Sequence, residues 1–176
     1  LAQLQSLPPD ARALVLEGYW QGESYFEADV ARQTYARLVE QAQSLVDPAL
    51  VQRLRVSPNA IAVHLRRRDY AHMGLCKDSY YLAALQHLRA NAPDAELFVF
   101  SDEPNYARHL LGSAGLAFQA VASGSDLGDL YLMSLCRHFV ISNSSYSWWA
   151  AWFGEAQGGQ VCCPKEWVTI DATPSP

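Results

Sequence analysis

The stretch DLYLMSLCRHFVISNSSYSWWAAW, from Asp129 to Trp152, determines the fold class of this 176-residue chain. Its apolar pattern predicts a helix, a short buried strand and a second helix. The first amides of a helix have no acceptor within it, and the helix dipole adds positive charge at that end. The turn before the second helix carries small polar residues, which are Ser142, Asn143, Ser144, Ser145 and Ser147. Such a turn after a strand is typical of a site that binds an anion.

The simpler interpretation of this turn is an ordinary helix N-cap, because Ser and Asn side chains accept hydrogen bonds from first-turn amides. The helix that follows argues for more than a cap. Trp148, Trp149 and Trp152 fall within five residues and give a wall of aromatic surface beside the turn. On a helix Trp148 and Trp152 share a face, whereas Trp149 points about 100° away. We expect one of these faces to pack on the sheet and the other to face another domain.

Around this stretch, short apolar runs alternate with helical segments. The expected strands are 60–66, 96–102, 117–121, 138–142 and 160–164, and the expected helices are 78–90, 104–111, 126–137 and 145–152. A strand-like run at 13–16 and a mostly helical segment at 32–54, interrupted near Pro48, precede them. This alternation predicts an α/β fold of the Rossmann-like type, with a parallel sheet flanked by helices. Ligands of such sheets bind beyond the carboxyl ends of the strands.

Size and composition exclude several classes of protein. With 176 residues, 50% of them hydrophobic, the chain can bury a full core but has no apolar run of transmembrane length. Its net charge of −5 argues against a surface for nucleic acid. The four cysteines fit neither a zinc pattern nor a disulfide scaffold. We therefore expect a reducing compartment, with Cys162 and Cys163 as small buried hydrophobic residues.

A second cluster of anion-binding residues follows the strand at 60–66. The sequence HLRRRDY places His64 before Arg66, Arg67 and Arg68. Arginine suits a bidentate grip on phosphate, and three adjacent guanidinium groups repel one another unless an anion or carboxylate lies near. Surface or structural ion pairs are the simpler interpretation of an isolated run of this kind.

The strand at 96–102 ends in Ser101, Asp102 and Glu103. A carboxylate at this point can accept the N–H pair of a guanine edge, although capping of the next helix explains Asp102 nearly as well. The sequence has no glycine-rich dinucleotide fingerprint and no GK[ST] phosphate loop, which disfavours NAD chemistry and ordinary NTP hydrolysis. Arg, Ser and Asn at one sheet edge, beside aromatic residues, suit a nucleotide-sugar.

These motifs resemble those of a known family. HLRRRDY is similar to the HxRRxDY element of fucosyltransferases, and the stretch 129–152 looks like the signature of the alpha-1,2-fucosyltransferases of glycosyltransferase family 11. Three further elements resemble family segments in the same order, which are GYWQGESYF at 18–26, HMGLCKDSYY at 72–81 and FSDE at 100–103. The resemblance covers nearly the whole chain from Gly18 to Trp167.

The resemblance implies a GT-B architecture of two domains. Residues 55–176 would be its C-terminal, GDP-fucose-binding α/β domain, and residues 1–54 a linker and remnant of the N-terminal domain, whose GGLGNQMFQ-like element does not occur in this sequence. The implied reaction moves L-fucose from GDP-fucose to the 2-hydroxyl of a galactose in a glycan, with inversion. Neither a metal nor another cofactor is expected.

The resemblance also implies a donor site. Arg66 would grip the diphosphate and act in catalysis, because cleavage of the fucosyl bond leaves negative charge on the β-phosphate. Guanosine contacts would come from His64 and Asp102. The phosphate-binding turn would consist of Asn143, Ser144 and Ser145.

Two carboxylates are candidates for the general base. Asp69 lies nearest in the motif, but its arginine neighbours make it a poor proton acceptor. Glu23, from the segment 18–26, is the alternative.

The expected partners are GDP-fucose and a galactose-terminated glycan, with no nucleic acid. The expected location is the bacterial cytoplasm, with peripheral association at the inner face of the membrane. Two other functions stay open from the sequence: a GDP-binding module without activity, and a glycan-binding protein that uses its tryptophans as a sugar platform.

Overall fold

The computed structural model describes residues 22–68 and 74–167. Its α-helices are α1 (Ala28–Ala42), α2 (Pro48–Val56), α3 (Asp78–Asn91), α4 (Pro104–Ser113), α5 (Asp126–Ser134) and α6 (Ser145–Gly154). Its strands are β1 (Ile61–Leu65), β2 (Leu97–Ser101), β3 (Gln119–Val121), β4 (His138–Val140) and β5 (Val161–Cys162). Short 3-10 helices are η2 (Glu23–Tyr25), η3 (Gln43–Leu45) and η4 (Glu155–Gln157).

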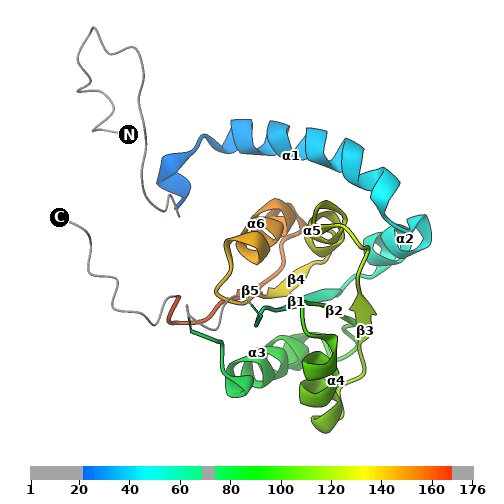
Figure 1. Cartoon of the computed structure of the whole chain (residues 1–176), viewed down its shortest axis with the longest axis vertical. Helices are drawn as coiled ribbons and strands as arrows, with labels where there is room; N and C mark the ends of the chain where they lie inside the picture. The colour runs from blue at the N-terminus through cyan, green and yellow to red at the C-terminus, as the bar shows by residue number, and fades with distance from the viewer. Residues whose placement is uncertain (1–21, 69–73, 168–176) are drawn as a thin grey trace, which may run out of the picture.

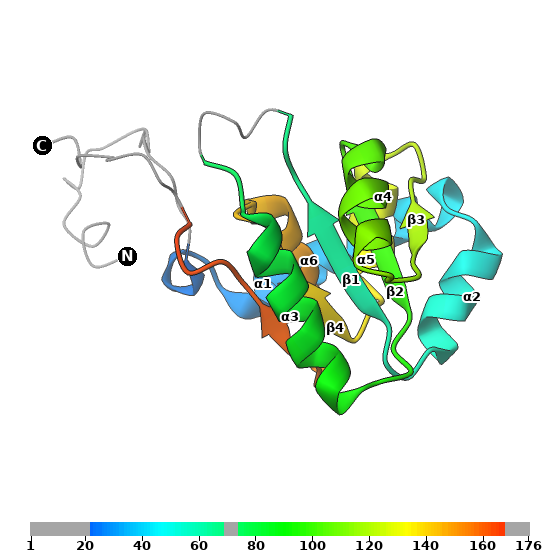
Figure 2. The same cartoon turned by 90° about the horizontal axis from the view of Figure 1, so that it is seen from below.

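The five strands form one parallel sheet in the order β3-β2-β1-β4-β5. The central strand β1 pairs with β2 on one side and with β4 on the other, so that Val63 lies opposite both Val99 and Val140. The chain first builds outward through β2 and β3, and then returns across the sheet to add β4 and β5 (Figure 2). The reversal of direction between β1 and β4 opens a crevice at their carboxyl ends, where ligands of such sheets bind.

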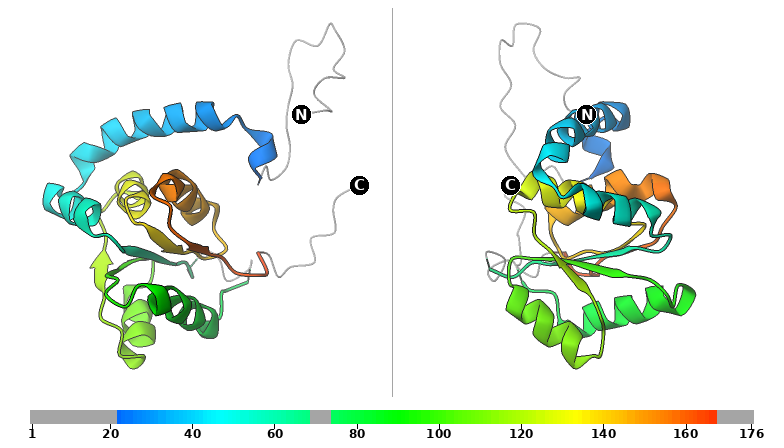
Figure 3. Two further views of the ribbon diagram at one scale, coloured as in Figure 1. Left: turned by 180° about the vertical axis from the view of Figure 1, so that it is seen from behind. Right: turned by 90° about the vertical axis from the view of Figure 1, so that its right-hand side faces the viewer.

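Helices cover both faces of this sheet. Figure 1 shows α5 and α6 on one face, with α1 arching across them, and α3 and α4 on the opposite face. The same layers are visible edge-on in the right-hand view of Figure 3. The α/β fold with a parallel sheet flanked by helices, predicted from the sequence, is confirmed.

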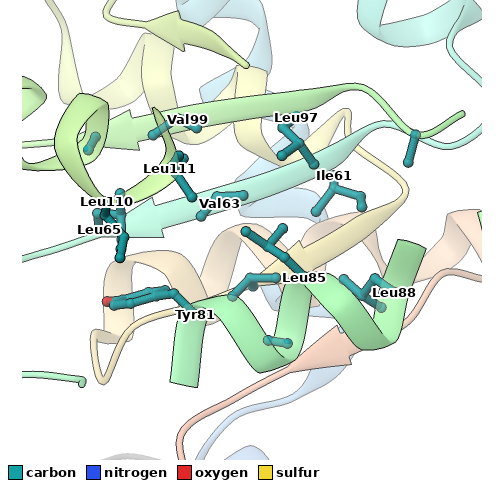
Figure 4. Close-up of a cluster of buried hydrophobic side chains, with 14 of the residues drawn as sticks. Ile61, Val63, Leu65, Tyr81, Leu85, Leu88, Leu97, Val99, Leu110 and Leu111 are labelled. Atoms are coloured by element: carbon teal, nitrogen blue, oxygen red, sulfur yellow. The ribbon is translucent and has the colours of Figure 1, made fainter. Parts of the chain in front are cut away.

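Strand alternation sorts the core into two layers. Ile61, Val63 and Leu65 of β1 face α3 and α4, where they pack with Tyr81, Leu85, Leu88, Leu110 and Leu111 (Figure 4). Ala60 and Ala62 face the other way, toward α5 and α6. His64 continues this second set, so its side chain belongs to the face that α6 covers.

The second core layer also takes in part of α2. Leu54 is buried there with Leu132 and Met133 of α5, and Leu50 and Val51 pack at its margin. The division predicted after residue 54 falls inside α2, which runs to Val56. That residues 1–54 derive from a second domain stays a prediction.

Helix α6 packs closely on the sheet because the face it buries is made of small residues. Ser147, Ala150, Ala151 and Gly154 are its buried residues, spaced three and four apart. A Cβ atom at Gly154 would lie 2.4 Å from Cζ of Phe139 and 2.8 Å from the carbonyl oxygen of Ser134. Of the three tryptophans, Trp148 is partly buried against the core layer on this face of the sheet, at the margin of the small residues. The expectation that the other tryptophan face turns toward another domain stays a prediction. Small side chains let the helix axis come close to the strands, and the indoles are left at the sides.

The three tryptophans gather instead around Phe26, just before α1. Ring centroids lie 4.8 Å apart for Phe26 and Trp149, 5.4 Å for Phe26 and Trp152, and 6.3 Å for Phe26 and Trp148. Tyr35 of α1 stacks on Phe153 at 4.0 Å, and its hydroxyl group is hydrogen-bonded to that of Ser134. These contacts fasten α1 across α5 and α6.

The remaining expectations concern single positions. Pro48 interrupts the first helical segment as predicted and stands in the first turn of α2, where proline is tolerated. Cys162 is partly buried and Cys163 is exposed, so the prediction of a buried Cys163 is wrong, because β5 ends at Cys162. The strand-like run at 13–16 lies outside the described residues. Within 22–68 and 74–167, no helix is long and apolar enough to cross a lipid bilayer.

Candidate functional site

A cleft of about 320 Å³ lies at the carboxyl ends of β1, β2 and β4. Its walls come from four parts of the chain, and the lining residues are His64, Arg66, Phe100, Ser101, Asp102, Asp126, Asp129, Ser144, Ser145 and Tyr146. The cleft therefore brings together His64, Arg66, Asp102, Ser144 and Ser145, five of the residues that the sequence singles out. It lies at the reversal point of the sheet.

His64 forms the floor of this cleft. It is 4% exposed, and its Nδ1 shares a hydrogen bond of 2.9 Å with the hydroxyl group of Ser142, which follows β4. Burial, together with the neighbouring charge of Arg66, lowers the pKa of His64 to about 3, so the ring is neutral at physiological pH. Within the described residues the Nε2 atom has no hydrogen-bond partner, and it remains for a ligand.

The turn into α6 forms the wall that can hold an anion. Ser144 occupies the N-cap position in an extended conformation, but its side chain makes no capping hydrogen bond. The amide of Trp148 donates to the carbonyl of Ser144 at 3.0 Å, so the amides of Ser145, Tyr146 and Ser147 precede the first intrahelical bond. The predicted N-cap is thus present in backbone conformation only. These amides and the Ser144 hydroxyl are positioned to bind a phosphate oxygen.

Asp102 organises the loop after β1. One carboxylate oxygen, Oδ1, accepts the Arg67 amide at 3.1 Å, and the other, Oδ2, accepts the Arg68 amide at 3.1 Å. Oδ2 also lies 3.4 Å from Nε of Arg66. The carboxylate therefore turns the Arg66 side chain toward the cleft, and Oδ1 keeps capacity for one further donor. Direct contact of Asp102 with guanosine stays a prediction.

The other two arginines of the run have different surroundings. Nε of Arg67 lies 3.6 Å from the Glu103 carboxylate, and its guanidinium group stands 3.8 Å from the ring centroid of Tyr106. Arg68 is exposed. For Arg67, the simpler interpretation as a structural ion pair is confirmed.

Asn143 connects the turn before α6 to other segments of the chain. Its amide group donates to the carbonyls of Gly74 at 2.9 Å and of Trp167 at 3.0 Å, and its oxygen lies 3.4 Å from the Cys76 sulfur. Asn143 does not line the cleft around His64. Its predicted role in donor binding stays a prediction.

Sequence reasoning missed three residues of the cleft, Asp126, Asp129 and Tyr146. The Tyr146 hydroxyl donates to the carbonyl of Asp126 at 2.6 Å, and Asp129 accepts the amide of Ser123 at 2.7 Å. Burial, with the charges of Asp129 and Asp126, raises the pKa of Tyr146, which keeps this donor protonated. The signal that would have found the two acids is their position, just after the loop that follows β3.

The structure describes one of the two candidates for the general base. Glu23 lies in η2 and is exposed, next to Gly22, which lines a second cavity together with Ser145. Asp69 lies outside the described residues. Within the described ranges no three His, Cys, Asp or Glu side chains are grouped so as to hold a metal ion.

The sequence and the fold of this chain are similar to those of known proteins. The sequence model described as "Glycosyl transferase family 11" matches residues 6–168. An alpha-1,2-colitosyltransferase from Escherichia coli is 26% identical over 160 residues, which are 85% of this chain and 54% of that protein. The O-antigen biosynthesis glycosyltransferase WbnK, also from Escherichia coli, is 28% identical over 118 residues, or 62% of this chain and 39% of that protein.

A mammalian relative and a solved structure extend the comparison. Galactoside 2-alpha-L-fucosyltransferase SEC1 from Bos taurus is 28% identical over 152 residues, or 78% of this chain and 41% of that protein. The chain thus spans about half the length of these curated relatives, or less. The crystal structure of POFUT1 in complex with GDP superimposes with a TM-score of 0.51 at 14% identity, over 81% of this chain and 51% of that one. At this identity the likeness concerns the fold alone, and it confirms the expected Rossmann-like domain of the GT-B type.

Proposed function

Because this chain belongs to glycosyl transferase family 11, we propose that it binds GDP-fucose for an inverting alpha-1,2-fucosyltransferase reaction. L-fucose would pass to the 2-hydroxyl of a galactose in a glycan acceptor. The observation that carries the proposal is the cleft at the reversal point of the sheet, which Arg66 and the first residues of α6 line together with Asp126 and Asp129. The arginine and the α6 amides suit a diphosphate, and the two carboxylates suit the hydrogen-bond donors of a nucleoside.

The diphosphate would lie between Arg66 and the first turn of α6. Cleavage of the bond between fucose and the β-phosphate leaves negative charge on that phosphate. A guanidinium group and backbone amides held in place before the reaction stabilise such a charge without reorganising. The ion pair with Asp102 keeps the Arg66 side chain in position for this role.

The nucleoside would meet neutral and acidic groups. His64 presents an uncharged ring at the floor of the cleft, and Asp126 and Asp129 present acceptors at its side. Guanine and ribose both carry donors that carboxylates accept. We keep His64 and Asp102 as proposed guanosine contacts and add the two acids of α5 as further acceptors.

The donor sugar has a second candidate. One relative is named a colitosyltransferase, and two others are named for O-antigen biosynthesis and for fucosyl transfer. L-fucose and colitose are both 6-deoxy sugars, and they differ in the hydroxyl group at C3. Transfer assays with GDP-fucose and GDP-colitose as alternative donors separate the two.

A titration of the protein with nucleotides tests the proposal. We expect GDP to bind and UDP to bind much more weakly, because the phosphate contacts are shared and the base contacts are not. Equal affinities in calorimetry would remove His64, Asp102 and the α5 acids as readers of the base.

A transfer assay distinguishes an enzyme from a binding module without activity. We expect EDTA to leave transfer unchanged, and a loss that Mg²⁺ or Mn²⁺ restores would overturn the metal-free mechanism.

Glu23 and Asp69 both remain proposed bases, and replacement of each by its amide in the same transfer assay distinguishes them. The expected cytoplasmic location and peripheral membrane association stay predictions.

A further inference from the structure

A second cavity, of about 440 Å³, adjoins the cleft. Aromatic side chains make up most of its wall, namely Phe26, Trp148, Trp149 and Trp167. Ser145, at the start of α6, and Cys163, an exposed residue that follows β5, also line this cavity. Among the residues that the structure describes, none with a charged side chain lines this cavity. The proposed contacts with the phosphates and the base assign no group to this cavity.

Ser145 connects the two spaces, because it lines both of them. It is the first residue of α6, and its amide is one of those that can bind the terminal phosphate. A sugar bonded to that phosphate is only one oxygen atom away from it. With a diphosphate at the α6 turn and the nucleoside in the cleft, the group nearest to the aromatic cavity would therefore be the sugar of the donor.

The chemistry of the wall suits one class of sugar. A 6-deoxyhexose carries a methyl group where an ordinary hexose has a hydroxymethyl group, and one ring face is formed by C–H bonds. The faces of indole and phenyl rings pack against such apolar groups, whereas a buried hydroxyl group needs a hydrogen-bond partner, which a ring face does not supply. The neighbouring cleft, with its arginine and carboxylates, has the opposite character.

We propose that the aromatic cavity of Phe26, Trp148, Trp149 and Trp167 binds the 6-deoxyhexosyl group of the nucleotide-sugar and selects for its methyl group. This inference rests on the proposed function, since it needs a diphosphate at the α6 turn. It goes beyond that function by assigning the choice of donor sugar to residues that the phosphates and base do not touch.

A matched pair of donors tests the inference. GDP-L-galactose differs from GDP-L-fucose only by a hydroxyl group at C6. We expect GDP-L-fucose to bind the wild-type protein about tenfold more tightly, as one group in an apolar pocket typically discriminates. Trp148→Leu should reduce this ratio to near one while the affinity for GDP stays within about twofold. Trp152→Leu is the control, since Trp152 belongs to the same aromatic cluster but does not line the cavity.

A second variant keeps the test decisive if Trp148→Leu fails to fold. Cys163→Phe starts from an exposed residue and fills the cavity, so it should abolish the gain from the fucosyl group and leave GDP binding intact. Equal affinities of the wild type for the two sugars, or an unchanged ratio in Cys163→Phe, would overturn the inference. Absence of GDP binding to the wild type would instead refute the proposed function.

Discussion

Arg66 is the side chain whose loss we expect to weaken nucleotide binding most. Arg66→Ala would remove the charge-assisted hydrogen bond to phosphate that we propose, and such a bond is worth roughly tenfold or more in GDP affinity. Arg66→Lys should recover little, because a point charge does not reproduce the guanidinium fork. Arg68→Ala, at an exposed neighbour, is the control. Calorimetric titration measures all three, and near wild-type affinity in the Lys variant would show that net charge alone matters.

His64 makes the stability of the fold depend on pH. Its pKa is about 3 in the folded protein, against about 6.5 in an unfolded chain. Between these values the unfolded state binds a proton that the folded state excludes. The contribution of neutral His64 to the free energy of unfolding is therefore complete above pH 6.5 and is lost as the pH falls toward 3. At pH 5 the loss is about 2 kcal/mol.

Urea unfolding of the wild type and of His64→Asn, at pH 7.5 and at pH 5, measures this effect. Asparagine keeps a polar group beside Ser142 but does not titrate, so we expect the variant to lose clearly less stability on acidification. A parallel decline of both proteins would mean that other groups, such as His138, cause the pH dependence.

At the scale of elements, the close approach of α6 to β4 depends on Gly154. The nearest atoms to an added Cβ are in Phe139 and Ser134, at 2.4 and 2.8 Å, so Gly154→Ala should destabilise the fold by about 1–3 kcal/mol. Gly112 in α4 is the matched control, because an added Cβ there meets nothing within 4 Å. Gly112→Ala should be neutral or stabilising by up to about 1 kcal/mol. Melting temperatures of the two variants on the same side of wild type would contradict this packing argument.

For the whole molecule, the contacts of α1 predict a difference between the two faces of the sheet. Phe26→Ala removes the ring around which the three tryptophans gather, so amide hydrogen exchange should become faster in α1 and α6. Exchange in α3 should not change, because α3 packs on the opposite face. Val30→Ala, at an exposed position of α1, is the control. Uniformly faster exchange throughout the protein would show that α1 belongs to a single cooperative unit with the sheet.

The sequence by itself determined the alternation of strands and helices, because apolar periodicity, proline positions and turn residues act within a few residues of one another. It located the serine turn before α6 and the arginine after β1 for the same reason. Recognition of family motifs, rather than periodicity, then suggested the ligand that we propose for these residues.

Only the tertiary structure decided which of these residues meet. His64 and Ser142 are 78 positions apart, and they share a hydrogen bond because β4 adds beside β1. The same sheet order brings Asp126 and Asp129 into the cleft. It also lets α6 bury its small residues while the tryptophans of α6 pack around Phe26. Local patterns do not encode strand order or the depth of helix packing, since both depend on how separate elements share one core.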